Sequence, residues 1–320
     1  MKTRRTLLGA LAGGALTALT GRTGAQTATT LRIVVPYPPG GSSDRAARVL
    51  AEALQPRLGQ PVVVENITGA GGRLALRQLA SGPADAPVLV LVNPALMVVA
   101  PVVYKNNGYD PERDFQPLSQ ISSYEFAAAV AGAVPVREIK HLLAWIKANP
   151  DKANVGVPAT GSLPHFFAMM LGQAASAPIQ VVGYRGSAPL ATDLMGGHLP
   201  VAVDSLDALL PLHEGGKVRI LATSGAKRAV ADIPTFKEAG LNITATGWNV
   251  LYARPGLQPA LVERLSREVP TIMKLPEIRQ QFLALKSEPV SATTAQTKKM
   301  LDDFKALWVP VVKTSGLQFD

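Results

Sequence analysis

Short apolar runs alternate with segments of helical periodicity along most of the chain, and this alternation limits the fold more than any other feature. Residues 31–35 and 88–92 are continuous runs rich in Val, Leu and Ile, typical of parallel strands buried on both faces. Between them, residues 44–58 repeat apolar side chains at helical spacing, and Gly59 follows as a helix terminator. This order of elements predicts an α/β fold in which helices cover a parallel sheet.

Two long extended segments predict that the chain forms two lobes rather than one uninterrupted sheet. Long extended segments at residues 117–131 and 243–253 bracket the middle of the chain, and no Gly/Ser-rich linker separates sequential domains. We therefore expect a discontinuous first lobe from residues 26–122 plus 247–320, and a second lobe from residues 123–246. The two extended segments would be the hinge of a central cleft that closes on a ligand.

The N-terminal segment has the features of an export signal. Arg4 and Arg5 precede a weakly apolar run at residues 7–19, and small residues lead to a cleavage point after Ala25. The run is too short and too rich in Gly to span a bilayer. Residues 1–25 are therefore predicted to be a signal peptide, which places the protein in the periplasm. The arginine pair fits the twin-arginine route, and an ordinary Sec signal is an equal alternative.

The basic composition does not predict a nucleic-acid-binding protein. The formal net charge is +9, but residues 1–25 hold four basic residues and no acid, so the remainder carries +5. These charges form no basic block, and only 5% of residues are aromatic, so a phosphate footprint with stacking platforms is not expected. With no Cys and four His at no metal-ligand spacing, we expect neither a metal nor another cofactor.

Two glycine-rich loops join strands to helices in the predicted first lobe. Residues 36–44 read Pro-Tyr-Pro-Pro-Gly-Gly-Ser-Ser-Asp, and residues 69–72 read Gly-Ala-Gly-Gly. Glycine lets the backbone approach a ligand closely, and Ser42 and Ser43 are expected to cap the following helix. In α/β folds, ligands bind at the carboxyl ends of the strands, where such loops gather. The spacing is not that of a dinucleotide-binding fingerprint.

Two similar junctions occur in the predicted second lobe. In residues 159–165, Ser162 is expected to cap a helix, and in residues 184–189, Ser187 has the same expected role. Ser162 and His165 could also be the nucleophile and base of a secreted serine hydrolase, but Pro164 breaks the G-x-S-x-G pattern. Asp204 follows another strand-like run and is expected to cap the helix after it, with pairing inside the cleft as the alternative. No catalytic residue is therefore predicted, and the chain is expected not to be an enzyme.

Glycine- and serine-rich helix starts that face one cleft share one chemical preference. They offer backbone N–H groups and the positive ends of helix dipoles to negative oxygen atoms. The sequence lacks a P-loop and an arginine cluster, so phosphate is less favoured. We expect the ligand to be a small carboxylate.

Several motifs make the chain similar to a known family. They include Val35–Asp44, the run Leu58-Gly-Gln-Pro-Val-Val-Val-Glu-Asn66, Gly69–Gly72 and the run Gly183-Tyr-Arg-Gly-Ser-Ala-Pro189. Through them the sequence resembles the Bug (Bordetella uptake gene) family, the extracytoplasmic solute receptors of tripartite tricarboxylate transporters. The likeness covers nearly all of the chain after the predicted signal peptide.

The resemblance implies a type II periplasmic-binding-protein fold, with two lobes, a hinge and a central cleft. It also implies that loops of both lobes hold a ligand carboxylate. By motif, the ligand-binding residues would be Tyr37, Gly40, Gly41, Ser42, Asp44, Thr160, Ser162, His165, Tyr184 and Ser187. The expected partners are a small carboxylate and the membrane subunits of the transporter, and the receptor itself is expected to be a monomer. A sensor that presents the ligand to a signalling partner is the alternative.

Overall fold

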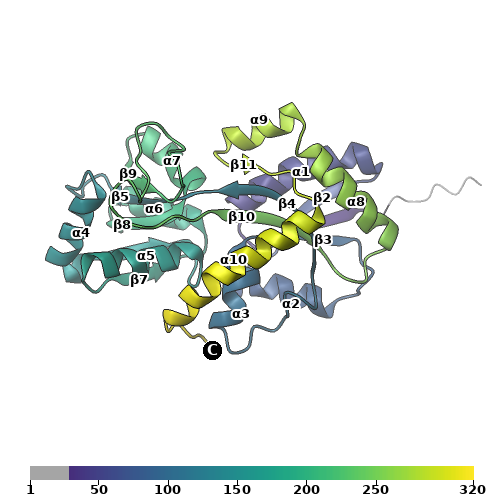
Figure 1. The fold of residues 1–320 in the computed structure, drawn as a ribbon, viewed down its shortest axis with the longest axis horizontal. Coiled ribbons are helices and arrows are strands. Elements are labelled where there is room, and N and C mark those ends of the chain that lie inside the picture. Colours follow the sequence, from purple (N-terminus) through teal and green to yellow (C-terminus); the bar gives the residue numbers. More distant parts are fainter. Residues whose placement is uncertain (1–28) are drawn as a thin grey trace, which may run out of the picture.

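The computed structural model describes residues 29–320, and the strands within them form two separate sheets (Figure 1). The predicted signal peptide lies outside the described residues. The first sheet has the strand order β11-β4-β10-β3-β1-β2 and the second has the order β7-β6-β8-β5-β9. We call the part around the first sheet lobe 1 and the part around the second sheet lobe 2.

Lobe 1 takes strands from both ends of the described chain. Its strands are β1 (Leu31–Val35), β2 (Val62–Asn66), β3 (Val88–Val92), β4 (Gln116–Tyr124), β10 (Gly247–Ala253) and β11 (Glu288–Pro289). β1 pairs in parallel with β2 and β3, whereas β10 pairs antiparallel with β3 and β4. All five residues of β3 are buried, as expected for a strand covered on both faces.

Lobe 2 is built from one continuous stretch of chain. Its strands are β5 (Phe126–Ala131), β6 (Asn154–Val157), β7 (Gln180–Gly183), β8 (Val201–Ser205) and β9 (Val218–Thr223). β6 pairs in parallel with β7 and β8, while β5 pairs antiparallel with β8 and β9. The carboxyl ends of β6, β7 and β8 therefore lie at one edge of this sheet, and the loops after them gather there.

Helices cover both sheets. Those of lobe 1 are α1 (Ser42–Leu58), α2 (Arg73–Ser81), α3 (Ala100–Val103), α8 (Pro259–Ile272), α9 (Pro276–Ala284) and α10 (Thr294–Thr314). Those of lobe 2 are α4 (Ile139–Ala148), α5 (Leu163–Ala175), α6 (Ser187–Gly196) and α7 (Leu206–Glu214). α1 buries Leu50, Leu54 and Leu58 on one face and ends at Gly59, whose φ of 66° is left-handed, so this predicted helix is confirmed. No helix of residues 29–320 is both long and apolar enough to cross a membrane.

The chain passes between the lobes at two neighbouring places. It runs from β4 into β5 across residue 125, and it returns from β9 to β10 through residues 224–246. β4 and β10 are adjacent strands, and Ser123 pairs in register with Trp248 beside the crossing. The two extended segments predicted from the sequence therefore lie together. The lobe boundaries that we expect at residues 122/123 and 246/247 stay a prediction.

The C-terminal helix α10 spans the two lobes (Figure 1). Trp308 packs edge-on against Phe167 of α5, with 5.8 Å between ring centroids. One turn earlier, Phe304 packs edge-on against Trp248 of β10, at 5.7 Å. Phe167 also contacts Phe126 and Phe236, so a cluster of aromatic rings fills the junction. Trp248 lies in this core and is 2% exposed.

Candidate functional site

The loop of residues 36–41 joins β1 to α1, and we call it the lobe 1 loop. Two asparagines at the ends of neighbouring strands hold its tyrosine. The Tyr37 hydroxyl donates to Asn93 Oδ1 at 2.6 Å, and Asn66 Nδ2 donates to the Tyr37 carbonyl at 3.0 Å. Burial raises the pKa of Tyr37 well above its ordinary value, so the hydroxyl stays protonated. Tyr37 is therefore fixed to the sheet of lobe 1.

Asp44 shapes the lobe 1 loop from within α1. Its carboxylate accepts hydrogen bonds from the Gly40 N–H at 2.9 Å, from Arg48 Nε and Nη2 at 3.0 and 2.9 Å, and from Asn66 Nδ2 at 2.9 Å. Burial favours a higher pKa, but the hydrogen bonds from Arg48, Gly40 and Asn66 outweigh it and lower the pKa of Asp44. This carboxylate is ionised and already engaged, so its effect on a ligand is through the shape of the loop.

The first turn of α1 is left without a side-chain cap. The N-cap residue is Gly41, with no side-chain hydrogen bond to the helix, and Ser42 is the first helical residue. The Ser43 hydroxyl instead donates to Asn249 Oδ1 at 2.6 Å. The prediction that Ser42 and Ser43 cap this helix is therefore wrong. The consequence favours binding, because uncapped N–H groups at a helix start attract anions.

The loop after β6 carries three of the predicted site residues, and their hydrogen bonds go to the backbone. Thr160 is exposed. Ser162 is the N-cap residue of α5 as expected, but its hydroxyl donates to the Ala159 carbonyl at 2.7 Å and accepts no hydrogen bond from the helix. His165 Nδ1 accepts the Gly161 N–H at 3.1 Å, and burial lowers the pKa of His165. Within residues 29–320 no hydrogen bond joins the side chains of Ser162 and His165, so the geometry gives no support to a serine hydrolase.

The loop after β7 leads to α6, which also begins without a side-chain cap. Its N-cap residue is Gly186, and Ser187 is the first helical residue, so the expected capping role of Ser187 is wrong. The Tyr184 hydroxyl donates to Asp193 Oδ2 at 2.8 Å, and burial together with Asp193 raises the pKa of Tyr184 to about 12. The Gly186 N–H donates to the Pro158 carbonyl at 2.9 Å, which ties the two loops of lobe 2 together.

The lobe 1 loop touches the loops of lobe 2. Gly186 has a left-handed φ of 112°, and a Cβ built on it would lie 3.1 Å from Pro38 Cγ. Glycine is therefore required here both by backbone conformation and by the close approach of Pro38. The contact brings Gly40, Gly41 and Ser42 of lobe 1 to the same region as Ser187 of lobe 2.

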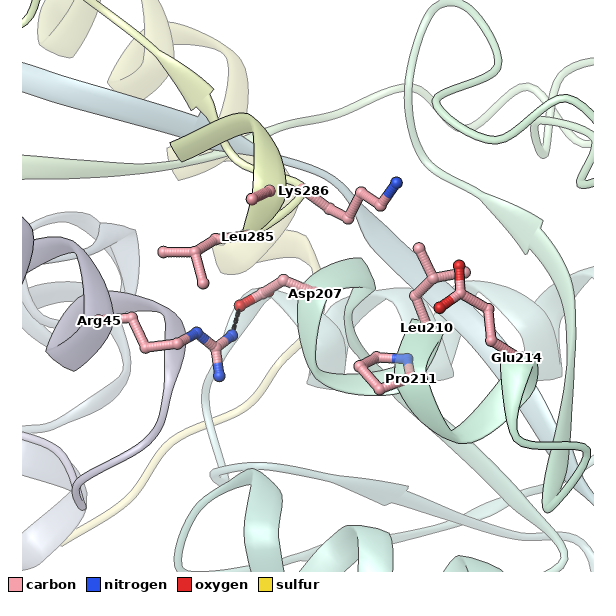
Figure 2. A pocket seen from close by; sticks show the side chains of 8 residues that line it. Arg45, Asp207, Leu210, Pro211, Glu214, Leu285 and Lys286 are labelled. Carbon is pink, nitrogen blue, oxygen red and sulfur yellow. Dashed lines mark hydrogen bonds and ion pairs between the residues drawn. The ribbon is translucent and has the colours of Figure 1, made fainter. Parts of the chain in front are cut away.

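An ion pair also crosses between the lobes beside this contact. Arg45 of α1 pairs through Nη2 with Asp207 of α7, and its Nη1 donates to the Gly40 carbonyl. The Asp207 side chain is only 2% exposed and that of Arg45 is 29% exposed. Figure 2 shows the pair at one side of a pocket of about 190 Å³, which is lined by α7 and by the turn after α9. Neither residue was singled out from the sequence.

Asp204 lies at the same edge but does not cap α7 as expected. It is the fourth residue of β8, and Ser205 is the N-cap residue of the helix. Asp204 Oδ1 accepts the Ser205 N–H at 2.7 Å, whereas Oδ2 is buried and has no hydrogen-bond partner in the described part of the chain. The capping role was favoured from the sequence because a strand end and a helix cap share the same preference for a polar residue.

The assembled site can hold an oxyanion but offers little for other chemistry. Two helix starts without side-chain caps, those of α1 and α6, meet at one edge with hydroxyls from Ser42 and Ser187. Such starts provide N–H donors and a favourable dipole for a carboxylate. Among residues 29–320, no group of three or more His, Asp or Glu is placed to hold a metal ion.

Comparison with known proteins gives one family. The family model of the tripartite tricarboxylate transporter family receptor matches residues 46–317. Protein BugT of Bordetella pertussis is 30% identical over 290 residues, which are 89% of each chain. Members of this family are periplasmic binding proteins.

Solved structures show the same fold. The periplasmic binding protein BugD is 28% identical, with a TM-score of 0.83 over 90% of this chain and 98% of its own. R. palustris Rpa4515 with adipate is 29% identical, with a TM-score of 0.86 over 90% of this chain and 98% of its own. The predicted periplasmic-binding fold and the resemblance to the Bug family are both confirmed. The chain belongs to the tripartite tricarboxylate transporter receptor family.

Proposed function

We propose that this protein is a periplasmic receptor that encloses a small carboxylate between its lobes and delivers it to the membrane subunits of a tripartite tricarboxylate transporter. The observation that carries the proposal is the meeting of the uncapped starts of α1 and α6 at one edge. Positive helix ends on both lobes mean that an anion between them stabilises the closed arrangement. No chemical turnover is part of this function.

The ten residues expected at the site divide into two groups in the proposal. We assign direct ligand contact to the groups that remain available at the meeting edge, namely Gly41, Ser42, Thr160 and Ser187. The other six fix the loops, because their polar atoms already bond within the protein: Tyr37, Gly40, Asp44, Ser162, His165 and Tyr184.

Closure is proposed to bend the two crossings between the lobes. They lie beside each other at the ends of β4 and β10, so bending both moves lobe 2 as one body. The contact of Pro38 with Gly186 and the pair of Arg45 with Asp207 both join one lobe to the other. We propose that the arrangement described here is the closed one, and that opening separates these two contacts.

A dicarboxylate is the first ligand to test, because the relative Rpa4515 was solved with adipate at 29% identity. The experiment is a thermal-shift screen of the purified protein against mono-, di- and tricarboxylates, with adipamide as the uncharged match for adipate. A ligand at about 100 times its Kd adds about 2.7 kcal/mol to the free energy of unfolding, which is readily measured as a raised Tm. The amide should give no shift.

Mass spectrometry of small molecules that co-purify with the protein is the complementary measurement. A carboxylate released on unfolding would name the physiological ligand. If no acid in the screen raises the Tm and no acid co-purifies, the proposal is wrong. Deletion of the gene should reduce uptake of the ligand; an effect on transcription with normal uptake would favour the sensor instead. Light scattering of the purified protein checks the expected monomer.

A further inference from the structure

Asp204 is a buried acid at the edge where the two lobes meet. Only one of its two carboxylate oxygens accepts a hydrogen bond within the described part of the protein. The residue is 3% exposed. Oδ1 accepts the Ser205 N–H, but Oδ2 has no partner in residues 29–320 although it is shielded from water. A buried acceptor without a partner destabilises a fold, so its presence at a binding edge points to a ligand group that completes it.

The polar and charged groups that act on Asp204 come from α1, α6, the start of α7 and the end of β4. Ser187 at the start of α6 and the Ser205 N–H at the start of α7 both favour the ionised form, as does Arg45 of α1. Tyr124 at the end of β4 is also close to Asp204. Burial is the main cause of the raised pKa of this tyrosine, and the charge of Asp204 is the second cause. Arg45 itself is paired with Asp207 and with the Gly40 carbonyl.

These neighbours do not compensate for burial. Burial raises the pKa of Asp204 to about 6, although Ser187, the Ser205 N–H and Arg45 act in the opposite direction. A second carboxylate brought beside it raises the pKa further, because two like charges in one site cannot both stay ionised. One shared proton turns this repulsion into a hydrogen bond between the two acids.

We propose that Asp204 is a specificity-determining residue of the ligand site, which binds the ligand carboxylate in its protonated form and donates its hydroxyl to a ligand oxygen through Oδ2. The inference rests on the proposed function and adds the protonation state of the site. The proton comes from solvent, and the ligand carboxylate stays ionised; no bond of the ligand forms or breaks. Where the free Asp204 is ionised, binding of one ligand therefore takes up one proton.

The proposal fixes the sign and the slope of the pH dependence. Below about pH 6 the free Asp204 is already protonated, so Asp204 no longer makes the affinity for an ionised carboxylate depend on pH. Above that pH the proton must be gained on binding, so the affinity falls by up to tenfold per pH unit. At pH 8 the affinity is expected to be about 100-fold below its low-pH value, provided that the pKa of Asp204 in the complex is above 8.

The test is isothermal titration calorimetry with adipate between pH 6 and pH 8.5, in pairs of buffers with different ionisation enthalpies. The difference between paired buffers counts the protons taken up. If adipate does not bind, the same titration uses the acid that gave the largest Tm shift in the screen. Asp204→Asn keeps the shape and is neutral at every pH, and its amide can donate. We expect it to bind with no proton uptake and, at pH 8, more tightly than the natural protein.

Two further variants make the result specific. Asp232→Asn, an exposed acid of lobe 2, is the matched control and should leave both proton uptake and pH slope unchanged. Ser187→Ala removes a group that lowers the pKa of Asp204, so the pH at which the affinity begins to fall should move upward. A thermal melt of each variant confirms that it is folded.

Each outcome decides between the two proposals. Binding with one proton taken up, abolished in Asp204→Asn, supports the role of Asp204. Binding with no proton uptake and the same pH profile in Asp204→Asn overturns it and leaves the proposed function standing. Preferential binding of an aminocarboxylate that is lost in Asp204→Asn also overturns it, because Asp204 would then pair ionised with an ammonium group. No binding of any carboxylate at any pH removes the proposed function and this inference together.

Discussion

Replacing Arg45 with methionine should weaken ligand binding strongly, because Arg45 holds one of the contacts between the lobes. In the closed arrangement Asp207 is 2% exposed at its side chain and pairs with Arg45. Without the guanidinium, closure would bury this carboxylate uncompensated, which costs about 3 kcal/mol at the lower end of measured values. In the open arrangement that we propose, Asp207 is expected to be solvated by water, so the penalty falls on closure alone. About 3 kcal/mol corresponds to a loss of roughly 150-fold in affinity.

The double variant separates this penalty from damage to the fold. Arg45→Met with Asp207→Leu removes both charges, and it should recover most of the affinity, to within about tenfold of the natural protein, because no buried charge remains unpaired. Titration calorimetry with the ligand from the screen measures the affinity, and urea unfolding measures the stability of each protein.

Arg57→Met is the matched control. Its ion pair with Glu268 has side-chain exposures of 32% and 20%, and both residues belong to lobe 1. We expect it to lower the stability slightly and leave the affinity unchanged. The reasoning is refuted if Arg45→Met binds within about twofold of the natural protein, or if Arg57→Met loses as much affinity as Arg45→Met.

Three other variants test the loops and the core. Gly186→Ala should lower the free energy of unfolding by about 1–2 kcal/mol because its backbone is left-handed, and it should weaken ligand binding because the new methyl group meets Pro38. Gly197 is also left-handed but has no neighbouring atom that a methyl group would meet, so Gly197→Ala should lower the stability without weakening binding. Burial lowers the pKa of His165, so as the pH falls the histidine of the unfolded chain takes up a proton before that of the folded protein. The free energy of unfolding should therefore decrease below about pH 6.5. Urea unfolding at several pH values should show a smaller decrease for His165→Asn. Phe167→Ala should cost about 3–5 kcal/mol by calorimetric or urea unfolding, because it opens a cavity among aromatic rings.

Each of these expectations has a contradicting result. Equal loss of affinity in Gly186→Ala and Gly197→Ala would show that the approach of Pro38 is irrelevant to binding. A fall in stability with acid that is just as steep in His165→Asn would assign that fall to other groups. A loss below about 1 kcal/mol in Phe167→Ala would mean that the junction between α5 and α10 is loosely packed.

The sequence predicts the two-lobed architecture because the pattern that carries it is local. Buried runs such as Val88–Val92 and the repeating apolar face of α1 are visible within a few residues. The extended segment expected at residues 243–253 is shorter in the structure, where the strand begins at Gly247. The short helical segments over residues 95–103 were not predicted, since a buried apolar run of that length fits a strand or a helix equally.

The site is less accessible to sequence reasoning because its contacts join distant residues. The loops were predicted from glycine and serine between strands and helices, but the N-cap residues proved to be Gly41 and Gly186 rather than the serines. The pair of Arg45 with Asp207 joins residues 162 positions apart and exists only because the lobes touch. No local pattern marks either residue, since arginine and aspartate at helix starts are usually solvated.

The two lobes differ in how much of the chain must exist before each can fold. Strands β5 to β9 all lie within Phe126–Thr223, so the sheet of lobe 2 can be completed once that stretch has been synthesised. The sheet of lobe 1 lacks its central strand until β10 is present, which leaves the edges of β3 and β4 unpaired until late. Lobe 2 can therefore nucleate independently, whereas lobe 1 depends on contacts of long sequence separation, which form slowly. Until the C-terminal quarter of the chain joins it, lobe 1 is the half of the molecule most open to misfolding and aggregation.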